Sequence, residues 1–187
     1  MWYKIKTAII KWFGNIQIFP YPSFIMFGHT AYEMKGEDVR DVLNIIKPGD
    51  IVLRRYNHYV SGLMIPGHFT HAAIYMGDGK IVHMLGDGID KQDILTFCRC
   101  DQVAIIRCND EQINKIAIKK SASYFKQGIK YDFDFDFSDG KEFSCTEFIN
   151  DIFNHPKMDR IKENYIMPDD FLTLDKTIFE VKYQKGK

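Results

Sequence analysis

The sequence contains few cysteines and no excess of charge of either sign, and both features restrict the kinds of protein that it can be. Four of the 187 residues are cysteine (Cys98, Cys100, Cys108 and Cys145). That number is too small for a disulfide scaffold, so we expect reduced thiols. Lysine plus arginine and aspartate plus glutamate both number 25, which gives a formal net charge of zero. Without a basic field we expect no nucleic-acid partner.

The N-terminal part of the chain lacks an apolar segment suited to crossing a membrane. The uncharged run from Trp12 to Gly28 contains Pro20 and Pro22, which would break a spanning helix. No small-residue cleavage site closes an apolar block, so we expect no signal peptide and predict a cytoplasmic protein. Lysines and aromatic residues in residues 2–13 leave open a surface helix with weak membrane contact, although a helix packed on the domain is favoured.

Linker-like tracts and internal repeats are also lacking, which indicates a single domain over residues 1–187. The spacing of apolar residues within it alternates between helical and strand-like periods, which predicts an α+β fold. We expect helices over residues 37–46, 111–127 and 145–153, and strands over residues 51–53, 70–75, 80–84, 103–107 and 178–183. Residues 54–67 and 86–93 are expected to form loops that line a pocket.

The segment Phe143–Ile149 places Cys145 at the start of a predicted helix. The free N–H groups and the dipole at a helix N-terminus favour a thiolate, so we expect a lowered thiol pKa. The same N–H groups can hold the oxyanion of an acyl-transfer intermediate. These properties make Cys145 a candidate nucleophile, whereas the alternative is an inert cysteine in the core.

A base for this thiol is sought among six histidines, of which His71 and His83 lie on adjacent predicted strands. A two-residue turn at Asp78–Gly79 would pair Ile74 with His83 and place the two imidazoles on opposite faces. A three-residue loop that begins at Gly77 would instead pair Ala73 with His83, so that both imidazoles share one face. Glycines on both sides of Asp78 favour the longer loop.

Under the longer loop, His71 is the candidate base and His83 is the residue that orients it. A Cys–His–polar site then follows if the helix of Cys145 packs against the face that carries both imidazoles. His68 is a rival base, but its spacing of three residues from His71 directs it to the other face of a strand.

Two segments resemble metal-binding motifs but lack the ligands that these motifs require, and we expect neither a metal nor a cofactor. The alternating Asp and Phe residues of 132–137 do not form a calcium loop, because the sixth position is Phe137 and the twelfth is Phe143. Alternation of this kind favours a strand with one apolar face. Cys98, Cys100 and Cys108 lack the second paired motif of a zinc site.

Four motifs occur in an order that is similar to a known family: Lys47–Val52, His71–Gly79, Tyr131–Asp132 and Ser144–Phe148. Together they resemble the permuted papain-like amidases, the YiiX/YaeF-like branch of the NlpC-type cysteine hydrolase superfamily. The resemblance implies a circularly permuted NlpC/papain-like fold, in which the nucleophile helix packs against a small antiparallel barrel-like sheet. It also implies Cys145 as nucleophile, His71 as base and His83 as the third catalytic residue.

The resemblance covers residues 47–153 and implies an organisation and an activity. Residues 37–157 would form the core, with an N-terminal extension (1–36) and a C-terminal extension (158–187). The implied activity is cleavage of an amide bond in a peptide, a cell-wall peptide or an N-acyl compound, through a thioester intermediate. Two alternatives stay open: a lipid-directed acyl hydrolase or acyltransferase that uses the same site, and an inactive binding module of the same fold.

Overall fold

The computed structural model describes residues 5, 16–20, 23–27, 32–57, 65–132, 142–154, 166–174 and 176–185. The chain divides into two compact units, Met1–Glu33 and Met34–Lys187. In the first unit, β1 (Ile16–Pro20) and β2 (Ser23–Phe27) form an antiparallel hairpin. The helix expected over residues 2–13 lies outside the described residues except at one position. The organisation into one domain with two extensions stays a prediction.

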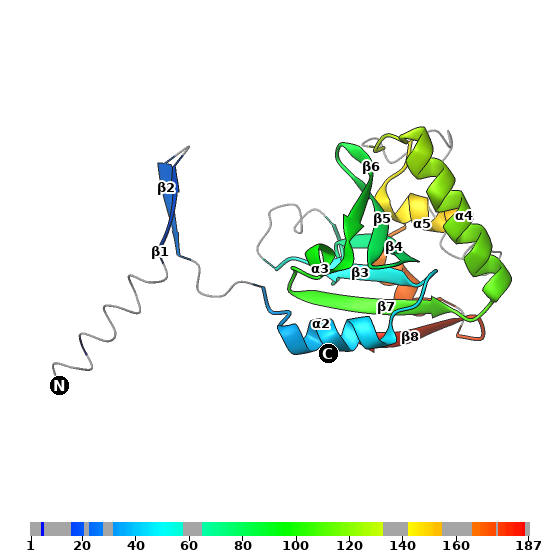
Figure 1. Ribbon diagram of the computed structural model, residues 1–187, viewed down its shortest axis with the longest axis horizontal. Coiled ribbons are helices and arrows are strands. Elements are labelled where there is room, and N and C mark those ends of the chain that lie inside the picture. Colours follow the sequence, from blue (N-terminus) through cyan, green and yellow to red (C-terminus); the bar gives the residue numbers. More distant parts are fainter. Residues whose placement is uncertain are drawn as a thin grey trace. The chain divides into compact units, whose positions relative to one another are not determined.

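An antiparallel sheet forms the body of the second unit (Figure 1). Six strands pair in the order β6-β5-β4-β3-β7-β8, and every neighbouring pair is antiparallel. Within the described residues the sheet is open, consistent with the small barrel-like sheet that the resemblance implies. The strands are β3 (Ile51–Arg55), β4 (His71–Gly77), β5 (Lys80–Leu85), β6 (Gly88–Asp93), β7 (Gln102–Cys108) and β8 (Phe179–Gln184).

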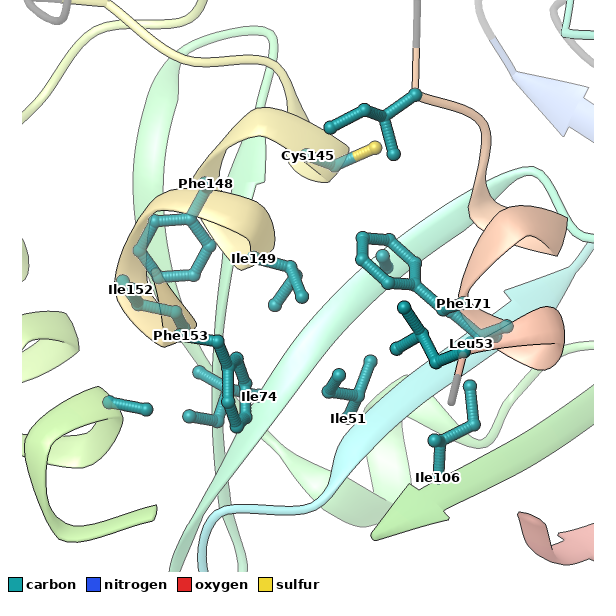
Figure 2. Packing of buried hydrophobic residues seen from close by; sticks show 14 of the residues in the cluster. Ile51, Leu53, Ile74, Ile106, Cys145, Phe148, Ile149, Ile152, Phe153 and Phe171 are labelled. Carbon is teal, nitrogen blue, oxygen red and sulfur yellow. The ribbon is translucent and has the colours of Figure 1, made fainter. Parts of the chain in front are cut away.

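The helices of the second unit cover both faces of this sheet. One face packs Ile51, Leu53 and Ile74 against Phe148, Ile149 and Ile152 of α5 (Cys145–Phe153), and α4 (Glu111–Gln127) lies beside α5 (Figures 1 and 2). The opposite face packs against residues of α2 (Gly36–Ile45) and α3 (Ile94–Phe97). A 3-10 helix, η3 (Pro168–Thr173), adds Phe171 to the first face. The predicted α+β fold is confirmed.

Most of the predicted elements of the second unit are present with bounds close to those expected. Helix α4 begins after Asp110, whose carboxylate accepts from the N–H groups of Gln112 (2.8 Å) and Ile113 (3.1 Å), and ends at Gly128 with φ 67°. Among the described residues, none of the helices is both long and apolar enough to span a membrane. The strand expected over residues 132–137 falls on positions outside the described residues from 133 onward.

Two loop predictions were wrong. Residues 88–93 form strand β6 at the edge of the sheet. Its sequence, Gly-Ile-Asp-Lys-Gln-Asp, has no regular apolar alternation, because an edge strand with partly exposed side chains needs no continuous apolar face. Strand β3 also extends to Arg55, so Arg54 belongs to the sheet rather than to the predicted loop.

The β4–β5 hairpin has the register that places both histidines on one face, but a different turn produces it. Asp78 (φ 50°) and Gly79 (φ 70°) form a two-residue turn with positive φ at both positions. An irregularity between Tyr75 and Gly77 then shifts the pairing by one residue, so that Ala73 pairs with His83. The bulge therefore gives the same pairing of Ala73 with His83 that the predicted three-residue loop would have given.

A buried ion pair fixes the start of β3. Asp50 is 1% exposed and accepts from Arg107 through both carboxylate oxygens, Nε to Oδ1 at 2.8 Å and Nη2 to Oδ2 at 2.6 Å. The N–H of Lys47 also donates to Asp50 (2.8 Å), which closes the turn containing Gly49 at φ 93°. This pair joins β3 to β7, and Asp50 serves the fold rather than the chemistry.

Candidate active site

The first residue of α5 is Cys145, and a capping box determines that the helix begins there. The Ser144 hydroxyl accepts from the N–H of Glu147 (3.3 Å), and the Glu147 carboxylate accepts from the N–H of Ser144 (2.6 Å). The box leaves the N–H groups of Cys145 and Thr146 at the helix terminus to face the thiol, where both lower its pKa. Figure 2 shows the sulfur at this end of α5, at the edge of the apolar cluster.

The thiol also meets the sheet at a place where two strands separate. The β4–β5 ladder ends at the pair Ala73–His83, whereas β5 continues to pair with β6 as far as Leu85. The N–H of Ala72 therefore has no partner in the β4–β5 ladder, and it faces the Cys145 sulfur instead. Cys145 thus lies beside the residue that follows His71 in the chain.

The face to which α5 packs differs from the prediction. Ala72 and Ile74 point toward α5, whereas Ala73 and Tyr75 belong to the opposite face. His71 and His83 share that opposite face with Phe97, at ring-centroid distances of 6.1 and 5.7 Å. The β4–β5 ladder ends at the pair Ala73–His83. The N-terminus of α5 brings the Cys145 sulfur to this end of the ladder from the sheet face opposite the two imidazoles.

The two imidazoles interact directly, as predicted. His71 Nε2 lies 2.9 Å from His83 Nδ1, and the rings meet edge to face with centroids 5.1 Å apart. Since Nε2 of His71 is engaged by His83, Nδ1 is the nitrogen left for proton exchange. In the part of the chain that the structure describes, the hydrogen bond of His71 is to His83 and not to the thiol of Cys145.

The carboxylate of Asp90 lies near Nε2 of His83, the ring nitrogen that does not contact His71. Asp90 pairs with His83 in the β5–β6 register, and its Oδ2 lies 3.8 Å from His83 Nε2. This separation is longer than a hydrogen bond, and His83 Nε2 is buried without a partner. Three groups therefore follow one another in the order Asp90, His83, His71.

Burial shifts the pKa of each of the three predicted site residues toward its neutral form. Burial, Arg54 and His83 hold the pKa of His71 well below its ordinary value. Burial and Arg54 lower the pKa of His83 to about 4, although Asp90 opposes the shift. Burial raises the pKa of the Cys145 thiol and outweighs the opposing N–H groups and Arg54. The lowered thiol pKa predicted from the helix N-terminus is therefore wrong, because that prediction took no account of burial.

Cys98 and Cys100 lie near Arg54, whereas His68 and Cys108 have partners elsewhere. Burial raises the pKa of both Cys98 and Cys100 to about 12, and it also raises the pKa of Cys108. His68 precedes β4, and its Nε2 is hydrogen-bonded to Gln102. Among the described residues, no group of three or more His, Cys, Asp or Glu side chains is placed to hold a metal ion.

Two residues beside the histidines were not singled out from the sequence. Arg54 pairs with His71 across β3 and β4, and it lowers the pKa of both histidines. Extending the predicted strand beyond Leu53 would have placed Arg54 next to His71. Asp90 would have been found by treating Gly86-Asp87 as a two-residue hairpin turn, because that turn pairs position 90 with position 83.

Comparison with known proteins identifies the family. The permuted papain-like amidase enzymes YaeF and YiiX, the C92 family, match residues 45–184. No curated protein matches the chain. A similar solved structure, that of metalloprotein yiiX from Escherichia coli O157:H7, has a TM-score of 0.48 and 17% sequence identity, covering 58% of this chain and 64% of that one. The present chain thus matches less than two thirds of that protein's length.

The family match includes Cys145, His71 and His83 and most of the second structural unit. It confirms the resemblance to the permuted papain-like amidases that was inferred from the four motifs. The chain belongs to the permuted papain-like amidase family of YaeF and YiiX.

Proposed function

We propose that this protein hydrolyses an amide bond of a peptide, a cell-wall peptide or an N-acyl compound through a thioester on Cys145. His71 is the general base and acid, and His83 orients it. One observation carries the proposal. The N-terminus of α5 brings the Cys145 sulfur to the N–H of Ala72, the residue that follows His71, and Nε2 of His71 is engaged by His83.

Burial favours a neutral thiol on Cys145 and a neutral imidazole on His71, so in this mechanism proton transfer accompanies the attack. His71 Nδ1 takes the thiol proton as the Cys145 sulfur bonds to the carbonyl carbon, and the carbonyl oxygen becomes an oxyanion. The N–H groups at the start of α5, those of Cys145 and Thr146, are suited to hold that oxyanion.

The same imidazole completes the reaction. The imidazolium of His71 gives its proton to the leaving amine, and the C–N bond breaks to leave a thioester on Cys145. His71, neutral again, removes a proton from water as the water oxygen attacks the thioester. The carboxylic acid departs, and the proton returns to the sulfur.

The order Asp90, His83, His71 supports one choice of tautomer. The Asp90 carboxylate favours the proton of His83 on Nε2, which leaves His83 Nδ1 to accept from Nε2–H of His71. His71 Nδ1 then carries a lone pair and no proton. That is the state in which it acts as a base toward the thiol.

The test is to trap the acyl-enzyme with a panel of N-acetyl-amino-acid p-nitroanilides, short cell-wall peptides and lipid esters. We expect the anilides or peptides to be turned over, with one acyl group added to Cys145 in the intact mass spectrum. Cys145→Ala and His71→Ala should each reduce kcat/KM by about 10³-fold or more, whereas Cys100→Ala and His68→Ala serve as matched controls.

Three outcomes would count against the proposal. Full activity in Cys145→Ala or in His71→Ala would remove the assigned nucleophile or base. Turnover of lipid esters alone would favour a lipid-directed acyl hydrolase. An unreactive Cys145 across the whole panel would favour a binding module of the same fold.

A further inference from the structure

Arg54 is a buried guanidinium that has no acidic partner among the described residues. The residue is 9% exposed and lies in the middle of the sheet on β3. Its Nε is sealed from solvent and has no hydrogen-bond partner. No ion pair joins Arg54 to a carboxylate among the residues that the structure describes, in contrast to Arg107, which is paired with Asp50.

Aromatic rings accommodate this charge but do not neutralise it. The guanidinium carbon lies 4.4 Å from the ring centroid of Phe97 and 5.1 Å from that of Tyr56. The nearby thiols of Cys98 and Cys100 remain neutral, because burial raises the pKa of both to about 12. A buried guanidinium that lacks an anion is costly to the fold, and such a cost is retained where function needs it.

The position of this charge ties it to the candidate site. Arg54 pairs with His71 across the β3–β4 ladder, and its ring contact Phe97 also packs against His71 and His83. It acts electrostatically on the Cys145 thiol as well. An anion bound to the guanidinium would therefore lie close to the scissile bond.

We propose that Arg54 binds an oxyanion carried by the substrate, a carboxylate or a phosphate group close to the amide that is cleaved. A guanidinium matches either group through paired N–H donors. The inference rests on the proposed function for the place of the scissile bond, and it narrows the substrate class from amides in general to anionic amides.

Binding of the anion has a second consequence for the chemistry. Without it, the positive charge of Arg54 lowers the pKa of His71 and of His83 and makes the imidazolium less stable. An oxyanion on Arg54 offsets that charge and raises the pKa of His71, with Asp90 already acting on His83 in the same direction. An anionic substrate would thus strengthen the base that acts on it.

Equilibrium binding tests the anion site independently of turnover. Full-length Cys145→Ala protein is titrated with N-acetylglycine, methyl phosphate and the neutral N-acetylglycinamide. NMR follows the Arg54 Nε–H resonance and, in every variant, the ring resonances of His71. We expect one or both anions to shift the Arg54 resonance and to raise the titration midpoint of His71, with affinity about tenfold or more above that of the amide. The stronger anion identifies the carboxylate or the phosphate as the natural group.

Two variants show whether the effect belongs to Arg54. Arg54→Met removes the charge and keeps an apolar side chain against Phe97, and Arg54→Lys keeps the charge without the planar fork. We expect anion binding to be lost in the first and weakened in the second, while Arg40→Met, which removes a surface arginine of α2, binds as the parent does. Equal binding of all three probes, or unchanged anion binding in Arg54→Met, would overturn the inference.

Turnover by the active enzyme gives a second test of the anion site. An anilide substrate with a free carboxylate is compared with its carboxamide, and we expect kcat/KM to favour the acid by about tenfold or more. Arg54→Met should bring this ratio close to one, and Arg40→Met should keep it. A ratio that survives in Arg54→Met would contradict the anion site.

The two arms separate failure of the inference from failure of the proposed function. Anion binding at Arg54 without any turnover would leave the site standing and would contradict the amidase proposal. Turnover without a preference for the anionic substrate would support the amidase proposal and contradict the anion site.

Discussion

The two ends of β3 each carry a buried charged group, and the fold treats them differently. At the N-terminal end, Asp50 receives two hydrogen bonds from Arg107 and one from the N–H of Lys47. Near the C-terminal end, Arg54 lies as deep as many core residues, yet its Nε has no partner. One strand thus has a satisfied charge just before its first residue and an unsatisfied one near its last.

The difference separates what maintains the fold from what the site requires. A buried charge whose hydrogen bonds are complete fixes the geometry around it, and here it joins β3 to β7. A buried charge that lacks a partner contributes no such restraint and acts through its field. The field of Arg54 reaches His71, His83 and Cys145.

The largest expected effect that tests this comparison is on the free energy of unfolding. Asp50→Ala leaves the guanidinium of Arg107 largely buried without its carboxylate, and we expect it to lower the free energy of unfolding by about 3–5 kcal/mol. Arg54→Met replaces an unpaired charge with an apolar side chain, and we expect a change within about 1 kcal/mol or a gain. Urea unfolding of both variants and the parent measures the difference. Equal losses would show that both arginines are structural.

The pH dependence of stability sharpens the same comparison. His83 has a pKa of about 4 in the folded protein, because of burial and Arg54, against about 6.5 when unfolded. Above pH 6.5 both states are neutral, and as the pH falls toward 4 the unfolded state takes up the proton first. The free energy of unfolding should therefore fall by about 3 kcal/mol over this range through His83 alone.

The control for this effect is His83→Gln, which keeps a buried polar group but cannot titrate. Urea unfolding at pH 7 and pH 4.5 should show a shallower loss of stability in the variant than in the parent. Most carboxylates contribute equally to both proteins, so the difference between them reports the titration of His83 together with its effect on the pKa of His71. Parallel losses would mean that His83 titrates at its ordinary pKa.

Much of the fold could be predicted because local patterns determine it. The helix that begins at Cys145 follows from Ser144 and Glu147, which form a capping box at the expected spacing. The placement of His71 and His83 on one face was also predicted, although a bulge between Tyr75 and Gly77 produces the register in place of the expected three-residue loop. These features depend only on residues close together in the chain.

The features that were missed depend on contacts distant in the chain. The side of the sheet from which Cys145 approaches is set by where the β4–β5 ladder ends, which no local pattern records. The raised pKa of its thiol is set by burial, a property of the whole core. Arg54 becomes notable only because β4 places His71 beside it.

Within the candidate site, His83→Ala tests whether the pair of imidazoles works as a unit. The change removes the partner of His71 Nε2, so the ring loses its orientation and its preferred tautomer. We expect kcat to fall about 10- to 100-fold, less than the loss for His71→Ala. His83→Gln should recover part of the rate, because its amide oxygen can accept from His71. No recovery would indicate that the imidazole of His83 is needed for more than orientation.

Asp90→Asn carries the smallest expected effect, because the carboxylate is 51% exposed and lies 3.8 Å from His83 Nε2. We expect kcat/KM to fall about 3- to 10-fold at low salt, since the amide no longer favours the proton on Nε2. The fall should shrink at about 0.5 M salt, where an exposed charge is screened. Asp87→Asn, in the turn between β5 and β6, should have no effect. A loss that does not depend on salt would indicate that Asp90 acts through packing of β6, and its charge would then have no part in orienting the histidines.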